Sequence, residues 1–378
     1  MKLNLSDFGK HKNFAPLSLT KPIAALRSGI MTNTERYKLF LPDAEIGFET
    51  ETYLSKKFPM LPCDLLINAC VIPNTDFIAA IMHLEDNQSL CFNELVVAKK
   101  GNGTELISYT GDTIIVLNER WELFQKNAQI LALDFVNITA NRVSETLSDS
   151  NLLIGSPENI FIEKGGQIEG CTLNTNDGPI YIGENAEVME GSLIRGGFAL
   201  CEFATLKMGS KIYGATTIGP HCKVGGEVNN VIFEAYSNKG HDGFLGNSLV
   251  GSWCNLGADT NTSNLKNNYS NVRTYSYNEQ KEIQTDLQFI GLSMGDHSKC
   301  AINTMFNTAS VVGVACNIFT HGFPSKHIPS FSWVSGEDSL ANELKKVLEA
   351  ANNMMSRRGL SISTNDEEIL THLSKTRD

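Results

Sequence analysis

The sequence predicts a parallel β-helix, preceded by a small mixed α/β domain and followed by a helical tail. Three observations support this prediction. First, an aliphatic residue occupies every sixth position through residues 182–228. Second, the residue four positions after each of these is usually small. Third, residues 1–145 lack this period. A helix has a period of about 3.6 residues and a simple strand a period of about 2, so a period of six indicates short strands joined by corners.

The repeat defines two classes of inward-facing position. The aliphatic positions are Ile182, Val188, Ile194, Leu200, Leu206, Ile212, Ile218 and Val224. The positions four residues later are Ala186, Ser192, Phe198, Ala204, Ser210, Thr216, Cys222 and Val228. We expect the aliphatic side chains to stack on their counterparts in neighbouring coils, and the smaller ones to fit beside the corners.

The register is interrupted, and the interruptions predict loops that leave an intact solenoid. It starts weakly at Ile154 and Ile160, reappears at Ile168, and lapses through residues 231–243 and 261–290. Between and after these lapses, the aliphatic positions are Phe244, Val250, Leu256, Met294, Cys300, Phe306, Val312 and Ile318. The predicted solenoid therefore covers residues 152–330.

The flanking segments have other periods. Strands are predicted at residues 65–67, 95–98 and 113–117, and helices at residues 24–40 and 121–136, which together indicate an α/β domain over residues 1–145. The tail, residues 336–378, has helical spacing over 338–358, with Gly359 as a C-terminal cap, and a second short helix over 365–374. Such a tail could cover the open end of the solenoid.

Composition excludes several classes of protein. The net charge of −11 argues against nucleic-acid binding, and no apolar run of eighteen residues is present for a membrane span. The N-terminus lacks the apolar segment of a signal peptide, so we expect a cytoplasmic protein. Nine scattered cysteines without a C-x-x-C pair indicate reduced thiols, with Cys222, Cys254, Cys316 and Cys300 at inward positions.

The lapses in the register hold the candidate chemistry. His241 lies in the first, between Gly240 and Gly243, and a loop histidine is either a general base or a surface or hydrogen-bonded structural residue. The second begins after an Asn- and Gly-rich turn, residues 255–264, which suits ligand contact or is simply a turn.

At these positions the chain resembles a known family. Lys239-Gly240-His241, Leu245-Gly246, Asn255-Leu256-Gly257-Ala258 and Asn264 together are similar to the acetyltransferase half of the GlmU family, whose product is UDP-N-acetylglucosamine. The resemblance implies a left-handed β-helix, a homotrimer, acetyl-CoA or another acyl-CoA as co-substrate, and a sugar phosphate or nucleotide sugar as acceptor.

The resemblance also implies roles for individual residues. His241 would be the catalytic base, Asn255 would contact the sugar phosphate, and Asn264 the acyl group. Lys239, Gly257 and Glu227 complete the implied substrate-binding set, and residues 294–296 would begin the pantetheine-binding wall. The chain departs from the family at Leu265, Phe244 and Asn229, which replace two tyrosines and a phosphate-binding lysine. The acceptor, and N- versus O-acylation, therefore stay open.

A second resemblance covers the N-terminal domain. Residues 16–30 are similar to the opening of a GlmU-like group of bacterial sugar nucleotidyltransferases, and the likeness continues through residues 121–127, 240–243 and 305–308. Nucleotidyltransferases need a Gly-rich loop after their first strand, but residues 7–13 contain a single glycine, which predicts a reduced domain. Lys21 and Arg27 are candidate phosphate ligands or ordinary charged residues, and Mg²⁺ is expected only if this domain is active.

Four functions remain as hypotheses. An acyl-CoA-dependent acyltransferase with His241 as base leads, and a sugar-1-phosphate nucleotidyltransferase follows. A third is a zinc hydrolase, for which His297, His321 and His327 are candidate ligands, although their spacing matches no ligand motif. For the nucleotidyltransferase, a metal-binding Asp is expected after a buried strand, but Asp64 and Asp112 each precede a predicted strand. The fourth is a non-catalytic nucleotide-sugar-binding or scaffold protein.

Overall fold

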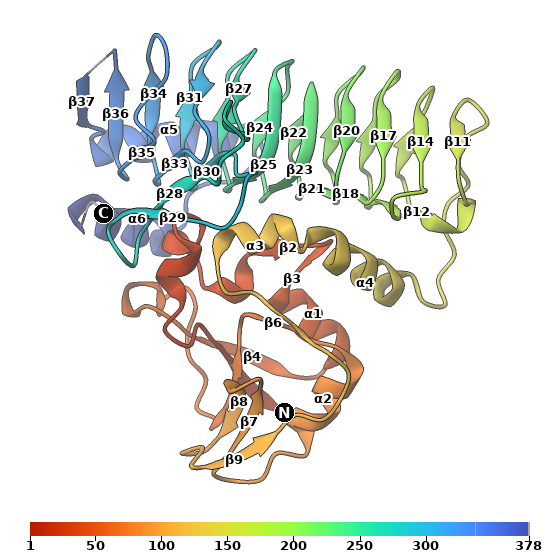
Figure 1. The fold of residues 1–378 in the computed structure, drawn as a ribbon, viewed down its shortest axis with the longest axis vertical. Helices are drawn as coiled ribbons and strands as arrows, with labels where there is room; N and C mark the ends of the chain where they lie inside the picture. The colour runs from red at the N-terminus through yellow and green to blue at the C-terminus, as the bar shows by residue number, and fades with distance from the viewer. Residues whose placement is uncertain (337, 377–378) are drawn as a thin grey trace. The chain divides into compact units, whose positions relative to one another are not determined.

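The computed structural model describes residues 1–336 and 338–376, which form two compact units (Figure 1). The first unit comprises Met1–Phe14, Ser18–Leu26 and Met31–Arg120, and the second Ala15–Leu17, Arg27–Ile30 and Trp121–Asp378. Helices α3 (Arg120–Gln125) and α4 (Asn127–Thr139) therefore belong largely to the second unit, although the predicted boundary lay at residue 145. Asn127 explains this, because its buried side-chain amide donates to Ala215 O of the solenoid at 2.9 Å.

The first unit is built on a mixed sheet, in agreement with the predicted α/β domain. Its strand order is β4 (Glu45–Glu49), β1 (Lys2–Ser6), β5 (Leu65–Asn68), β8 (Leu95–Lys100), β7 (Gln88–Phe92) and β9 (Glu105–Ser108). The other elements are α2 (Thr75–Met82), β6 (Val71–Ile72), β10 (Ile115–Val116), η1 (His11–Phe14), η2 (Leu17–Thr20), η3 (Ile23–Ala25), η4 (Thr52–Leu54) and β3 (Met31–Thr32).

The helix predicted over residues 24–40 is wrong in its first half. Helix α1 spans only Asn33–Phe40, because Thr32 caps it: the Thr32 hydroxyl accepts from Glu35 N at 3.2 Å, and the Glu35 carboxylate accepts from Thr32 N at 2.6 Å. This reciprocal pair fixes the helix start. The preceding residues instead form η3 and the short strand β2 (Arg27–Ser28).

The second unit is a left-handed parallel β-helix, as predicted, with three faces. The first face contains β11 (Leu152–Ile154), β14 (Thr172–Asn174), β17 (Leu193–Arg195), β20 (Lys211–Tyr213) and the start of β23 (Glu227–Phe233), with β27 (Asn261–Thr262) pairing β32 (Met305–Phe306) in later coils. The second contains β12 (Ile160–Ile162), β15 (Ile180–Ile182), β18 (Phe198–Leu200), β21 (Thr216–Ile218), the ends of β23 and β25 (Phe244–Val250), β30 (Ser293–Met294), β33 (Val311–Val312) and β35 (His327–Ile328), and the start of β25 continues the first face.

The third face carries the candidate site. Its strands, in order, are β13 (Gln167–Ile168), β16 (Glu187–Val188), β19 (Thr205–Leu206), β22 (Lys223–Val224), β24 (Asn238–Lys239), β26 (Asn255–Leu256), β31 (Lys299–Cys300), β34 (Asn317–Phe319) and β36 (Ser332–Ser335). Strands β28 (Arg273–Ser276) and β29 (Lys281–Gln284) form an antiparallel hairpin within the predicted excursion over residues 261–290, and η5 (Pro157–Asn159) lies in the first coil.

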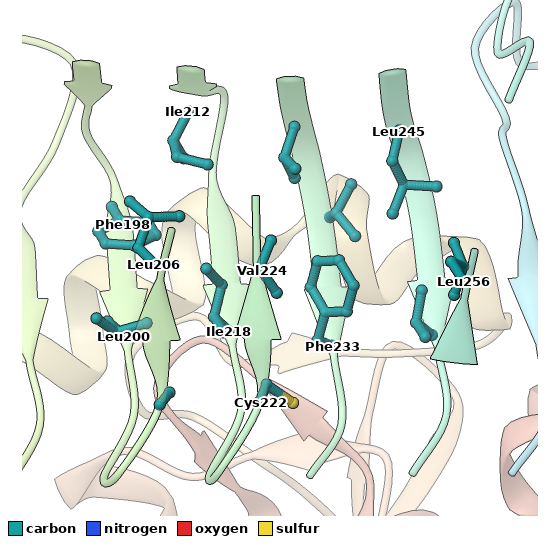
Figure 2. Packing of buried hydrophobic residues seen from close by; sticks show 14 of the residues in the cluster. Phe198, Leu200, Leu206, Ile212, Ile218, Cys222, Val224, Phe233, Leu245 and Leu256 are labelled. Atoms are coloured by element: carbon teal, nitrogen blue, oxygen red, sulfur yellow. The ribbon is translucent and has the colours of Figure 1, made fainter. Parts of the chain in front are cut away.

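The core confirms the six-residue register through residues 182–228 (Figure 2). Every aliphatic position in this run is buried, as is every position four residues later, so side chains from the three faces fill one continuous interior. Two positions outside the run were assigned wrongly. Ile154 is exposed while Leu153 packs on the core, and Phe244 is half-buried while Leu245 is fully buried. Corners and insertions differ in length, so counting by six slips by one residue across them.

One corner of the solenoid carries a ladder of stacked rings. Phe203, His221, Tyr236 and Trp253 occupy equivalent corner positions with φ of 56°, 57°, 62° and 60°. Their ring centroids lie 4.9, 4.6 and 4.2 Å apart, and the planes are within 7° of parallel. Stacking between coils offsets part of the cost of the left-handed backbone at these non-glycine residues.

The tail departs from prediction at its start. Residues 338–341 are not helical: β37 (Asp338–Ala341) pairs antiparallel with β36 and covers the last strand edge of the third face. Helix α5 then spans Leu344–Ser356, Gly359 has φ of +70° just beyond it, and α6 spans Thr364–Thr376. Residues 337 and 377–378 of the predicted tail lie outside the described residues.

The cysteines are reduced, as predicted. All nine are free, and seven of them are buried. Among the described residues, no helix is both long and apolar enough to cross a membrane.

Candidate functional site

A pocket of about 540 Å³ lies on the third face of the solenoid, beside His241. The residues around it come from four consecutive coils, the loop at Ile302 and the end of α5. They are Lys207, Lys223, Asn238, Gly240, His241, Asn255, Leu256, Gly257, Ala258, Ile302, Met354, Arg357 and Arg358. The structure thus brings together His241, Asn255 and Gly257 from the predicted set.

Strand register builds the floor of this pocket. Lys223 pairs with Asn238, and Asn238 with Asn255, so three outward-facing polar side chains stand side by side on successive coils. Gly240 directly follows the inward residue Lys239, and Gly257 directly follows the inward residue Leu256. A Cβ at Gly240 would meet no atom within 4 Å, whereas one at Gly257 would collide with the Ala301 backbone at 2.4 Å. Gly257 is therefore required for coil packing, and Gly240 keeps the space beside His241 open.

Two polar groups at this pocket have no hydrogen-bond partner in the described ranges. The His241 imidazole is exposed and forms no hydrogen bond with any side chain or carbonyl in the described ranges. Asn238 Oδ1 is buried and accepts no hydrogen bond within the described part of the chain. A buried amide oxygen without a donor is costly, so this atom suits a ligand hydroxyl or amine.

Lys239, predicted to bind substrate, does not point into the pocket. It pairs with Val224 and takes the inward position of the repeat, with 1% of its surface exposed. Its ammonium donates to Gly225 O at 3.1 Å and to His241 O at 2.8 Å. Burial lowers the pKa of Lys239 to about 8, against the opposing effect of Asp242 and Asp259. Lys239 therefore positions the His241 backbone. The prediction that its side chain binds substrate is wrong, because that side chain is buried in the core.

Asn264 and Glu227 lie outside the pocket. The Asn264 amide donates to Asn247 Oδ1 at 2.7 Å, at the corner between the first two faces. The Glu227 carboxylate accepts from the Tyr213 hydroxyl at 2.5 Å on the first face, and this contact together with burial raises the pKa of Tyr213 to about 12. Within this chain the structure does not bring either residue to His241.

Four cations around the pocket were missed by the sequence reasoning. Lys207 and Lys223 adjoin inward residues Leu206 and Val224, and Arg357 and Arg358 directly follow helix α5. The first two could have been found from the repeat, because Lys207 directly follows one inward residue and Lys223 directly precedes another. The arginines could not, since only the path of α5 brings them to these coils, where Arg358 donates to His221 O at 3.2 Å.

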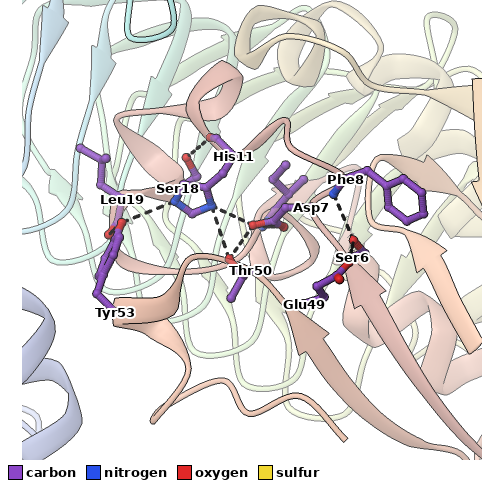
Figure 3. Close-up of polar contacts among 10 residues, drawn as sticks. Ser6, Asp7, Phe8, His11, Ser18, Leu19, Glu49, Thr50 and Tyr53 are labelled. Atoms are coloured by element: carbon purple, nitrogen blue, oxygen red, sulfur yellow. Dashed lines mark hydrogen bonds and ion pairs between the residues drawn. The ribbon is translucent and has the colours of Figure 1, made fainter. Parts of the chain in front are cut away.

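In the first unit, the loop after β1 is organised by buried side chains (Figure 3). Asp7 Oδ2 lies 2.8 Å from His11 Nδ1 and accepts from the Thr50 hydroxyl at 2.5 Å, while Asp7 Oδ1 accepts from Ile23 N at 2.9 Å. The Tyr53 hydroxyl lies 3.5 Å from His11 Nε2. This side-chain network holds the loop, which has Gly9 as its single glycine.

The two predicted phosphate ligands fall in different units. Lys21 is half-buried in the first unit. Arg27 is buried in the second, where its backbone N donates to Glu234 Oε1 at 2.9 Å and its guanidinium donates to Ile30 O. The prediction that Arg27 binds phosphate is wrong, because its guanidinium lies within the packed interior.

The candidate metal ligands do not come together in the described residues. No group of three His, Cys, Asp or Glu side chains among them could hold a metal ion. Asp7 has both carboxylate oxygens engaged, and Asp64 and Asp112 are exposed. His327 stacks on Tyr275 with centroids 3.5 Å apart, and His297 occupies a corner with φ of 62°. Among the described residues, no cluster of side chains therefore marks a Mg²⁺ site.

Comparison with known proteins supports the N-terminal resemblance. The family model described as sugar nucleotidyl transferase matches residues 3–143. This match covers most of residues 1–145, confirms the predicted resemblance of that segment and supports a transferase. No curated protein matches the chain.

Solved structures of acyltransferases are also similar to the chain. A UDP-N-acetylglucosamine acyltransferase from Arabidopsis is 18% identical, with a TM-score of 0.23, covering 61% of this chain and 90% of its own. LpxA, a UDP-N-acetylglucosamine acyltransferase from Bacteroides fragilis, is 13% identical, with a TM-score of 0.25 and coverage of 62% and 98%. The Campylobacter jejuni UDP-N-acetylglucosamine acyltransferase is 13% identical, with a TM-score of 0.23 and coverage of 62% and 97%.

Proposed function

We propose that the protein transfers an acyl group from an acyl-CoA, such as acetyl-CoA, to an amine or hydroxyl of a sugar phosphate or nucleotide sugar. The observation that carries this proposal is the pocket in which an uncommitted His241 stands beside Asn238, Asn255 and four cations. A titratable base, polar side chains that can orient a sugar, and positive charge for phosphate are the parts that such a transfer needs.

His241 acts as the general base. The acceptor amine or hydroxyl attacks the thioester carbonyl carbon and gives its proton to the imidazole. The C–S bond then breaks, and the CoA thiolate leaves and takes up that proton. Lys239 contributes by position, since its ammonium holds His241 O at 2.8 Å and so fixes the loop that carries the imidazole.

A backbone donor is available for the oxyanion that forms during attack. The equivalent amides of neighbouring coils are engaged: Gly225 N donates to Lys239 O at 2.7 Å, and Gly257 N to Cys300 O at 3.2 Å. The Gly240 amide, next to His241, has no such partner in the described ranges. It would stabilise the developing negative charge through a preorganised hydrogen bond.

The implied roles of Asn264 and Glu227 require a second copy of the chain. Neither side chain reaches the His241 pocket within one chain. We therefore propose a homotrimer in which these residues face a neighbour's donor or acceptor. Light scattering of the purified protein tests the trimer, and a monomeric mass in active samples would refute it.

Release of the CoA thiol, followed with acetyl-CoA and a panel of amino and hydroxy sugar phosphates and nucleotide sugars, tests the activity. His241→Ala should lower kcat by about 10² to 10⁴-fold, the usual contribution of a general base. His321→Ala, an exposed histidine on a later coil, is the matched control and should keep full activity. Wild-type rates in His241→Ala would show that the base is assigned wrongly.

Nucleotidyl transfer by the first unit is a second candidate, favoured by the family match over residues 3–143. The loop after β1 lacks the Gly-rich phosphate cradle, and its Asp7 and His11 side chains are used to hold the loop. Pyrophosphate release from UTP, dTTP or CTP with sugar 1-phosphates decides this candidate. No release with any pair of substrates would leave the first unit as a binding domain.

A further inference from the structure

The positive charge around the His241 pocket is a local exception in an acidic protein. The chain carries a net charge of −11, yet the pocket is lined by Lys207, Lys223, Arg357 and Arg358 and by no carboxylate. None of these cations forms an ion pair with a carboxylate in the described part of the chain. Burial and the nearby charges of Arg358, Lys207 and Arg357 lower the pKa of Lys223, with only Glu187 opposing.

The helical tail supplies half of this charge. β37 closes the third face, and α5 buries Val347, Ala351 and Met355. Its last turn reaches the coils that carry His221 and His241, where the Arg358 guanidinium donates to His221 O at 3.2 Å. A guanidinium has five N–H donors, so this single contact leaves others for a ligand. The tail therefore contributes side chains to the site as well as covering the strand edge.

We infer that Lys207, Lys223, Arg357 and Arg358 bind the diphosphate group of a nucleotide ligand in the His241 pocket. The four cations come from two coils and from the residues that follow α5, and two linked phosphoryl groups present more oxygens to such a spread of donors than a single phosphate group does. Arginine pairs with phosphate oxygens through two parallel hydrogen bonds, and lysine adds point charges. The volume of about 540 Å³ suits a nucleotide-sized ligand, and Ile302 and Met354 provide apolar walls for its rings or chain.

Two ligands of the proposed reaction carry this chemistry. A nucleotide sugar acceptor holds a diphosphate between nucleoside and sugar, and an acyl-CoA donor holds one between nucleoside and pantetheine. The inference rests on the proposed function in placing the chemistry at His241, and it identifies the substrate class of that site. It predicts that a simple sugar monophosphate does not require the arginines for binding.

Binding measurements on the full chain test this inference without turnover. Calorimetric titration of UDP, CoA, pyrophosphate and glucose 1-phosphate compares the wild type with the Arg357→Gln/Arg358→Gln double variant. Lys345→Gln, which removes one exposed charge at the other end of α5, is the control. We expect the double variant to bind UDP, CoA or both at least about tenfold more weakly, since each charge-assisted hydrogen bond lost is substantial. Glucose 1-phosphate should bind weakly and equally to all three proteins.

Which nucleotide loses affinity identifies the source of the diphosphate: UDP for the acceptor, CoA for the donor. Gly240→Val gives a steric test, since a Cβ there meets no atom within 4 Å and its methyls would enter the pocket. It should keep the wild-type melting temperature and lose the same nucleotide. Equal affinity of the double variant and wild type for both nucleotides, or no nucleotide binding by the wild type, would overturn the inference.

Failure of the inference and failure of the proposed function are distinguishable. His241→Ala should bind the diphosphate ligand with wild-type affinity while losing turnover. If no acyl transfer is found with any acceptor but the arginine variant still loses nucleotide affinity, the diphosphate site stands and the reaction assignment falls. If His241 is required for acyl transfer but the arginine variant binds normally, the reaction stands and the diphosphate site falls.

Discussion

The buried Lys239 predicts an unusual dependence of stability on pH. Its ammonium takes an inward position that is aliphatic in most other coils, and its pKa is lowered from the usual 10.5 to about 8. Between these values the unfolded chain binds more protons than the folded one, so the free energy of unfolding rises with pH. A shift of this size corresponds to about 3 kcal/mol, of which about 2 kcal/mol is regained between pH 7 and pH 9.5.

Lys239→Met removes the titrating ammonium and keeps a side chain of similar length. At pH 7 the variant gains about 3 kcal/mol by not burying a charge, but Gly225 O and His241 O lose their donor, which costs about 1 to 3 kcal/mol each. The two effects nearly cancel at pH 7. At pH 9.5 the relief is smaller, so the variant should fall behind the wild type by about 2 kcal/mol more than at pH 7.

Urea unfolding of both proteins at pH 7, 8, 9 and 9.5 measures this difference. Subtracting the two curves cancels all other titrating groups. Lys281→Met, whose parent side chain is 67% exposed, serves as the control and should give a difference that does not change with pH. A constant difference between wild type and Lys239→Met over this range would refute the buried, pKa-lowered lysine.

Two further predictions concern packing. Asn127→Ala should lower the free energy of unfolding by about 3 kcal/mol, because Gly29 N, Ala215 O and the Thr217 hydroxyl lose a buried hydrogen-bond partner. Urea unfolding measures this loss, with the exposed Asn353→Ala as the control. A loss below about 1 kcal/mol would contradict this role of Asn127. Rapid thiol labelling of the native protein should modify at most the half-buried Cys63 and Cys91, because the other seven thiols are buried. Burial also raises the pKa of the Cys222 thiol and so lowers its reactivity. Early modification of Cys222, detected by mass spectrometry, would contradict the packed core.

Local sequence patterns predicted the parts of the fold that depend on short-range repetition. Leu206, Ile212 and Ile218 recur at six residues because each coil repeats the same three short strands, and this periodicity survives without reference to other parts of the chain. The same reasoning failed for Phe244, where an insertion changed the residue count before the strand and Leu245 became the inward residue.

By itself, the sequence determined the solenoid, its interruptions and the position of His241 within one of them. Only the tertiary structure decided which polar residues share a pocket. Lys239 turned inward because strand register with Val224 fixes its direction, although its neighbours in the sequence line the pocket. Arg357 and Arg358 reached His241 from more than a hundred residues away because β37 and α5 follow the solenoid back along its third face. Register and chain path are long-range properties, and no local pattern encodes them.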